Sequence, residues 1–147
     1  MLYEKKSGAY LFSNDKKKLQ IDVIHTYLSK ESYWAQNISI ELVEKTIAGS
    51  ECFGIYQGYA LIGFARVITD LASFGYLADV FVLEEHRGKG LSKELIAFIM
   101  NYEPVTKFRR FMLATKDAHG LYAQFGFTPL AEPGRFMEIK PFETYPV

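Results

Sequence analysis

The chain has 147 residues, 49% of them hydrophobic and 16% aromatic, and its 17 basic residues balance its 17 acidic ones. This length and composition are typical of one domain with a core of its own, so we expect a single domain over residues 1–147. Zero net charge argues against a general attraction to nucleic acid or anionic membranes, and the one cysteine, Cys52, excludes an internal disulfide.

We expect no targeting segment at the start of the chain. No apolar stretch follows its first lysines, and no run of residues approaches the length of a membrane span. We therefore expect a soluble cytoplasmic protein with no nucleic-acid or membrane partner. Cys52 lies in a strand-like run, and we interpret it as a buried structural thiol rather than a nucleophile.

Two helices are predicted in the first third of the chain. A short apolar run at 9–12 and the polar break NDKKK at 14–18 precede them. Ser39 is a suitable N-cap for a helix over 40–48, which Gly49 can end. The first helix is indicated by apolar residues at helical spacing: Leu19, Val23, Ile24, Tyr27 and Leu28.

Three strands follow, separated by short breaks. They are predicted at 52–56, 59–68 and 76–82, with turns at Gln57-Gly58 and at 70–73. Tight turns between consecutive strands favour an antiparallel arrangement.

In the last third, strands and helices alternate. This order implies a crossover and a parallel pair. We therefore expect a mixed α/β fold, with a mostly antiparallel sheet of about six or seven strands and about four helices on both faces. The predicted elements are a helix from Leu91 through Ile99, a strand at 110–114, a helix at 118–125 capped by Asp117, and final strands at 127–130 and 136–139.

A glycine-rich, basic turn lies between the strand at 76–82 and the following helix. The backbone N–H groups at the start of a helix have no partner, and glycine lets a ligand approach them closely. With the nearby cations they could cradle a phosphate. The same residues could equally form a plain tight turn: Arg87, Gly88, Lys89, Gly90, Leu91, Ser92 and Lys93.

Two segments together resemble the GNAT superfamily of N-acetyltransferases. Val80-Phe81-Val82 followed by Arg-x-x-Gly-x-Ser at 87–92 is similar to its acetyl-CoA loop, with Ser92 where Gly or Ala is usual. DAHGLYAQFGF at 117–127 is similar to the family's later helix and its Gly-Phe end. Thr115 and Gln124 depart from the common Asn and Lys. The resemblance covers about the last two-thirds of the chain and agrees with the expected fold.

The resemblance implies an acetyl-CoA site and a role for Tyr122. Backbone groups of Val80 and Val82 would pair with the pantetheine arm, and Gly88–Lys93 would hold the pyrophosphate. Tyr122 would face the thioester sulfur, although a helical core tyrosine is the alternative. The cofactor-binding candidates are Val80, Phe81, Val82, Arg87, Gly88, Lys89, Gly90, Leu91, Ser92, Lys93, Thr115 and Tyr122.

The residues that would handle the amine are less clear. Asp79 lies among apolar neighbours in a strand, where a charged carboxylate is unfavourable unless it has a partner or a functional role. It could take the amine proton or attract the ammonium, or it could pair with Arg66 on a neighbouring strand. Asp70 is a lesser candidate. The family likeness implies that Tyr33 and Trp34 wall the acceptor site together with Phe74, although the aromatic pair could equally be a lid on the core.

We therefore interpret the chain as an enzyme that moves acetyl from acetyl-CoA to a primary amine by direct attack, with no metal. The acceptor is a small-molecule or peptide amine. The alternatives are a non-catalytic acyl-CoA sensor, an acetyltransferase for protein N-termini or lysines, and a protein that binds another nucleotide. The family resemblance also makes the aromatic C-terminal strands candidates for a homodimer interface.

Overall fold

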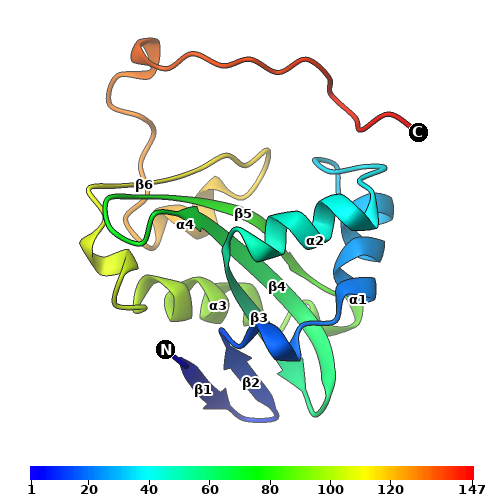
Figure 1. Cartoon of the computed structure of the whole chain (residues 1–147). Helices are drawn as coiled ribbons and strands as arrows, with labels where there is room; N and C mark the ends of the chain where they lie inside the picture. The colour runs from blue at the N-terminus through cyan, green and yellow to red at the C-terminus, as the bar shows by residue number, and fades with distance from the viewer.

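The protein is built around one mixed sheet of six strands. The computed structural model describes all residues, 1–147, and is shown in Figure 1. Strands follow one another across the sheet in chain order, and every neighbouring pair is antiparallel except the parallel last pair, β5 and β6. The strands are β1 (Glu4–Ser7), β2 (Tyr10–Ser13), β3 (Glu51–Gln57), β4 (Ala60–Thr69), β5 (Phe74–Val82) and β6 (Arg110–Leu113).

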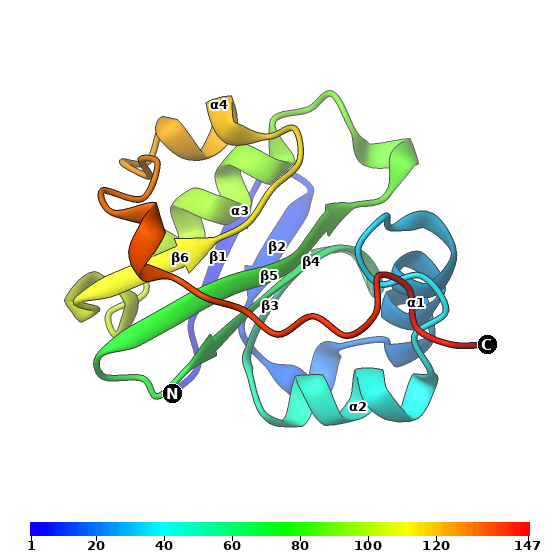
Figure 2. The same cartoon turned by 90° about the horizontal axis from the view of Figure 1, so that it is seen from above.

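Helices cover both faces of this sheet. In Figure 2, α1 and α2 lie on one side of it and α3 and α4 on the other. This arrangement confirms the predicted mixed α/β class. No helix combines the length and apolar character that crossing a membrane requires. The helices are α1 (Ile21–Thr26), continued by a π-helical turn (Tyr27–Glu31), α2 (Ile40–Ala48), α3 (Leu91–Met100) and α4 (His119–Ala123).

Alternation along the strands creates two cores, one on each face. In β3, Phe53 and Ile55 belong to the core under α3 and α4, whereas Cys52 and Tyr56 belong to the core under α1 and α2. Successive side chains of a strand point to opposite faces, so one strand can serve both layers. Cys52 is 2% exposed and its burial raises the pKa of the thiol to about 12, which agrees with a structural thiol.

The N-terminal hairpin was not predicted from the sequence. β1 and β2 pair through a two-residue turn, with Ser7 opposite Tyr10. Gly8 in this turn has a φ of +58°, a value that glycine adopts without a Cβ clash. The apolar run at 9–12 therefore belongs to a strand that pairs with β3.

The ends of both outer helices differ from the prediction. Leu19 precedes α1, because the Lys16–Lys18 turn ends there. Helix α4 is shorter than the predicted 118–125, and Asp117 does not cap it. The Thr115 hydroxyl instead accepts a hydrogen bond from the Ala118 N–H at 3.1 Å.

The prediction of two final strands is wrong. Residues 127–130 and 136–139 form no strand, and residues 128–144 are all exposed. Pro129 has no N–H to give to a ladder, and Pro133 and Gly134 form a short 3₁₀ turn that directs the chain away from β6. The second run has no neighbouring strand within its own chain.

Candidate functional site

The site begins where β5 and β6 separate. Their parallel pairing runs from Phe74 opposite Arg110 to Leu77 opposite Leu113, where β6 ends. β5 continues for five more residues, to Val82. This leaves one edge of its C-terminal half without a neighbouring strand, in a fork between β5 and the chain that follows β6.

A β-bulge shapes this open half of β5. Phe64 faces Phe81 and Arg66 faces Ala78, so Ala65 alone faces both Asp79 and Val80. Asp79 adopts a φ of +55°, in the left-handed region that non-glycine residues seldom enter. The extra residue bends the strand and leaves its backbone groups unpaired at the bulge.

The backbone groups of Val80 and Val82 point into the fork. The Leu83 N–H donates to the Ile62 carbonyl at 2.9 Å, so the polar backbone groups of Leu83 face β4. In an antiparallel ladder this direction alternates, so those of Phe81 also face β4 and those of Val80 and Val82 face away from it. The Phe81 side chain is buried in the α1–α2 core, where it stacks on Tyr27 at 4.1 Å between ring centroids.

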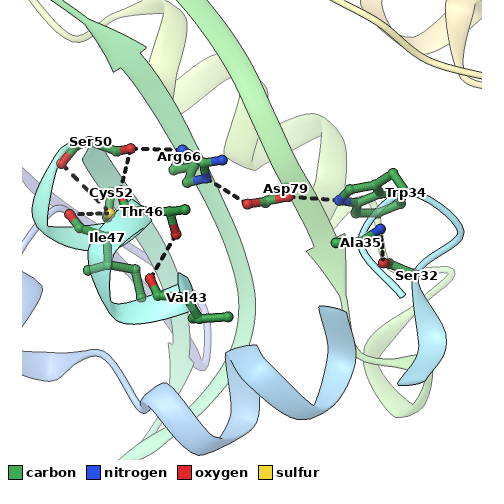
Figure 3. A network of polar contacts seen from close by, with 10 residues as sticks. All are labelled: Ser32, Trp34, Ala35, Val43, Thr46, Ile47, Ser50, Cys52, Arg66 and Asp79. Atoms are coloured by element: carbon green, nitrogen blue, oxygen red, sulfur yellow. Dashed lines mark hydrogen bonds and ion pairs between the residues drawn. The ribbon is translucent and has the colours of Figure 1, made fainter. Parts of the chain in front are cut away.

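The Asp79 carboxylate is held by two side chains, one from β4 and one from the loop between α1 and α2 (Figure 3). Arg66 Nε on β4 lies 2.6 Å from Asp79 Oδ2, and Trp34 Nε1 donates to Asp79 Oδ1 at 2.7 Å. Arg66 Nη1 also donates to the Ser50 hydroxyl at 3.0 Å. The side chains of Arg66 and Asp79 are only 14% and 9% exposed. Of the alternatives left open by the sequence, the structure therefore shows the pairing with Arg66.

The loop between α1 and α2 spans the fork. Trp34 fastens it to β5 through Asp79. On the other side, the Tyr33 hydroxyl accepts a hydrogen bond from the Lys116 N–H at 2.9 Å, in the segment after β6. The Lys116 ammonium also lies 5.4 Å from the centre of the Tyr33 ring. Trp34 packs partly against the α1–α2 core while Tyr33 is half-exposed, so the pair both lids the core and borders the fork.

The glycine-rich turn lies at the end of β5 and opens onto a pocket. Gly88 and Gly90 have φ values of +78° and +76°, and a Cβ at either would meet open space. Gly90 is the N-cap of α3, with no side chain capping the first N–H groups of the helix. A pocket of about 260 Å³ lies here, lined by Val82, His86, Arg87, Gly88, Gly90, Leu91, Ser92, Lys93 and Leu121.

The three cations of this turn do not act alike. Arg87 borders the pocket, but its guanidinium donates to the Val82 carbonyl at 3.0 Å and to the Tyr27 hydroxyl at 3.1 Å. Lys89 donates to the Tyr10 hydroxyl at 3.3 Å and does not line the pocket. Lys93 lines it and is the cation left for an anion there.

Tyr122 on α4 is buried close to this pocket. It is 8% exposed, it follows the pocket residue Leu121, and it shares a core with Val82 and Leu91. Its hydroxyl makes no hydrogen bond with the protein, although it is not sealed from solvent. Burial raises the pKa of Tyr122, and the neighbouring Tyr33 hydroxyl raises it further, so the phenol stays protonated at neutral pH.

Phe74 and Asp70 lie apart from this group, whereas Thr115 lies next to Lys116 at the fork. Phe74 is the first residue of β5, about 17 Å along the strand from Asp79. Asp70 accepts hydrogen bonds from the backbone of Ala72, Ser73 and Phe74, and the Ser73 hydroxyl and these N–H groups lower its pKa, which marks it as a turn residue. The Thr115 hydroxyl is used at the start of α4.

Sequence reasoning missed Ser50, Lys116 and Leu121. Ser50 and Lys116 act through contacts between segments distant in the sequence, and Leu121 carries no chemical signal of its own. No group of three or more His, Cys, Asp or Glu side chains could hold a metal ion.

The chain is similar to several known proteins. Residues 48–129 match the family model of the acetyltransferase (GNAT) domain. A candidate acetyltransferase from Gibberella zeae is 30% identical over 137 residues, covering 80% of this chain and 77% of that protein. The solved structure of a candidate GNAT acetyltransferase from Xanthomonas campestris pv. campestris is 47% identical, with a TM-score of 0.87 over 89% of this chain and 92% of that one. A protein of unknown function from meticillin-resistant Staphylococcus aureus shares the fold, with 22% identity and a TM-score of 0.71 over 89% of this chain and 98% of that one.

Proposed function

Because the chain belongs to the GNAT family of acetyltransferases, we propose that it transfers acetyl from acetyl-CoA to the primary amine of a small molecule, by direct attack. The observation that carries this proposal is the fork between β5 and β6, which opens beside the glycine-rich start of α3. The fork offers the backbone edge of an unpaired strand, and the turn offers unpaired N–H groups with positive partial charge.

These two features suit the two halves of coenzyme A. The pantetheine arm carries amides, which can pair with the backbone groups of Val80 and with the Val82 N–H as a further strand would, while the Val82 carbonyl accepts from Arg87. The pyrophosphate is an anion, which suits the N–H groups of residues 88–93 and the ammonium of Lys93. Leu121 lines the pocket at this turn, and its neighbour Tyr122 belongs to the same core as Val82 and Leu91, which supports a role for Tyr122 near the fork.

The reaction then needs two hydrogen-bond donors from the chain. The amine nitrogen forms a bond to the thioester carbon, and the C–S bond breaks with the electron pair leaving on sulfur. An N–H group at the bulge can donate to the oxyanion between these events. The Tyr122 hydroxyl donates to the departing thiolate, because its raised pKa keeps it protonated but makes it a weak acid.

In this proposal Asp79 orients the amine as one end of its ion pair with Arg66. Both of its oxygens are engaged, one by Arg66 and the other by Trp34. The Arg66 guanidinium offsets its negative charge, so the Arg66–Asp79 pair presents a fixed dipole at the bulge and not a free carboxylate. Ordered water carries the proton that the ammonium must lose before attack.

A variant of Tyr122 tests the assignment. We expect Tyr122→Phe to lower kcat about tenfold or more while the KM for acetyl-CoA stays within about twofold, because the lost hydrogen bond strengthens only as the thiolate forms. Tyr102→Phe is the matched control. Tyr102 is buried in the same core, but its hydroxyl donates to Glu51, so its kcat should be unchanged. Wild-type turnover in Tyr122→Phe would show that this role is wrong.

Calorimetric titration tests the substrate. We expect acetyl-CoA and CoA to bind more tightly than ADP, since only they can occupy the fork, and we expect thiol release when amines are added. Equally tight binding of ADP would indicate that the fork does not bind the pantetheine arm. Tight binding of acetyl-CoA without turnover on any amine would indicate a non-catalytic sensor.

A further inference from the structure

One cation of the glycine-rich turn is bonded to residues outside the turn. The Arg87 side chain borders the pocket, yet its Nε donates to the Val82 carbonyl at 3.0 Å and its Nη2 donates to the Tyr27 hydroxyl at 3.1 Å. Arg87 forms no salt bridge with a carboxylate. Two directional hydrogen bonds to neutral oxygens therefore fix this guanidinium, and they connect the turn to β5 and to α1.

Tyr27 is the residue through which Arg87 reaches the loop over the fork. The Tyr27 ring stacks on Phe81 of β5, with 4.1 Å between the centroids and 10° between the planes, and the residue is only 8% exposed. Its carbonyl accepts a hydrogen bond from the Ser32 N–H at 2.9 Å, where the π-helical turn ends and the loop begins. The hydroxyl, the ring and the carbonyl of this one residue therefore contact the turn, the strand and the loop.

The loop carries its indole next to this tyrosine. The centroids of the Tyr27 and Trp34 rings are 6.5 Å apart. Trp34 donates to Asp79 at the bulge of β5 (Figure 3), and the Asn37 N–H donates back to the Ser29 carbonyl at 3.1 Å. A displacement of Tyr27 would therefore move the start of the loop and the indole that holds Asp79.

We propose that Arg87 is a positioning residue for the loop over the fork, and that the Lys93 side chain is the one that holds the anion. Arg87 acts through the Tyr27 hydroxyl, and Tyr27 in turn fixes the loop that carries Trp34. The side chain that opens the glycine-rich turn therefore acts on the amine side of the fork and not on the cofactor. The kinetic part of this inference rests on the acetyl transfer proposed above, whereas the placement of Trp34 does not.

The variant Arg87→Lys separates the charge from the geometry. Lysine keeps a positive charge at the turn, but it is a point donor on a flexible stem and cannot bridge two acceptors as the planar guanidinium does. Tyr27→Phe removes only the hydroxyl and keeps the stacked ring. Because both changes break the same contact, the double variant Arg87→Lys/Tyr27→Phe should behave like either single variant.

Fluorescence measures the loop directly, because Trp34 is the only tryptophan of the chain. In the full chain without ligand, we expect Arg87→Lys and Tyr27→Phe each to shift the emission to longer wavelength and to increase quenching by acrylamide, since a loosened indole meets more water. Tyr10→Phe is the matched control, because it removes the hydroxyl to which Lys89 of the same turn donates, and Trp34 should be unaffected. Unchanged quenching in either test variant, or an equal change in the control, would overturn the proposal.

Calorimetric titration with CoA tests the assignment of the anion. We expect Arg87→Lys to bind CoA within about twofold of the wild type, and Lys93→Met to bind it about tenfold or more weakly, because a charge-assisted hydrogen bond to phosphate is lost. Trp34 quenching should keep its wild-type value in Lys93→Met. A loss of about tenfold or more in Arg87→Lys would assign its side chain to the cofactor and refute the inference.

Steady-state kinetics with benzylamine as the probe amine gives the third readout. In Arg87→Lys and Tyr27→Phe we expect the KM for benzylamine to rise several-fold while the KM for acetyl-CoA stays within about twofold, a split that a general loss of stability would not produce. A rise in the KM for acetyl-CoA alone would refute the positioning role. A wild-type protein that neither binds CoA nor acetylates an amine would refute the proposed function, and the Trp34 measurements would still decide the role of Arg87.

Discussion

Removing the Arg66 guanidinium should destabilise the protein strongly, because it leaves the Asp79 carboxylate buried without its partner. Breaking a buried ion pair from one side costs about 3–5 kcal/mol. Since the two side chains keep 14% and 9% exposure, we expect the low end for Arg66→Met, about 3 kcal/mol. Unfolding 147 residues carries an entropy of about 0.3 kcal/mol per kelvin, so the Tm should fall by about 10 °C.

A double-mutant cycle separates the pair from the packing around it. Asp79→Asn keeps a residue that tolerates positive φ and can still accept from Trp34, but it has no charge. Arg66→Met/Asp79→Asn should therefore be more stable than the sum of the single changes predicts, by about 1–2 kcal/mol. Calorimetry or thermal circular dichroism gives all four Tm values. A fall of less than about 3 °C for Arg66→Met, or strict additivity in the cycle, would refute this account of the bulge.

The remaining predictions concern the turn, the thiol and the loop. Gly90→Ala should raise the KM for acetyl-CoA several-fold, because the φ of +76° costs an L-residue about 1 kcal/mol or more; Gly49→Ala, at a helix end with negative φ, is the control. Cys52 should resist iodoacetamide in the native protein at pH 8, as read by mass spectrometry, and rapid labelling would contradict its burial. Because its pKa rises from about 8.5 in the unfolded chain to about 12 in the folded one, wild-type stability should fall relative to Cys52→Ala as the pH rises above about 9. Trp34→Phe should lose the donor to Asp79 and about 1.5–3 kcal/mol of stability in denaturant titrations, whereas Tyr33→Phe should lose less, and the reverse order would contradict the assigned contacts.

The sequence predicted the elements that carry their own local signals. α2 has the predicted bounds because Ser39 accepts from the Leu42 N–H and Gly49 follows the last turn. The three central strands agree with prediction to within two residues, since their apolar runs are bounded by clear turns. The glycine-rich turn was found because its glycines and cations are contiguous.

What the sequence could not provide depends on contacts between distant segments. The positive φ of Asp79 is stabilised by Arg66 on another strand and by Trp34 from a loop 45 residues earlier. Lys89 was expected at the anion pocket, but its ammonium donates to the hydroxyl of Tyr10 on β2 and does not line the pocket. The run at 136–139 has strand-like residues, yet a strand needs a neighbour, and no strand of the sheet pairs with this run.

The unequal fastening of the loop over the fork has a kinetic consequence. On the β6 side the loop is held at Tyr33 by one neutral hydrogen bond from the Lys116 N–H and by the exposed Lys116 ammonium beside the Tyr33 ring, each worth about 1 kcal/mol or less. On the β5 side it is held by a bond to a charged carboxylate and by the burial of an indole. We therefore expect the loop to swing about Trp34 and to release at Tyr33. Such a gate would admit the two substrates in a fixed order, with coenzyme A entering before the gate closes and leaving only after it reopens.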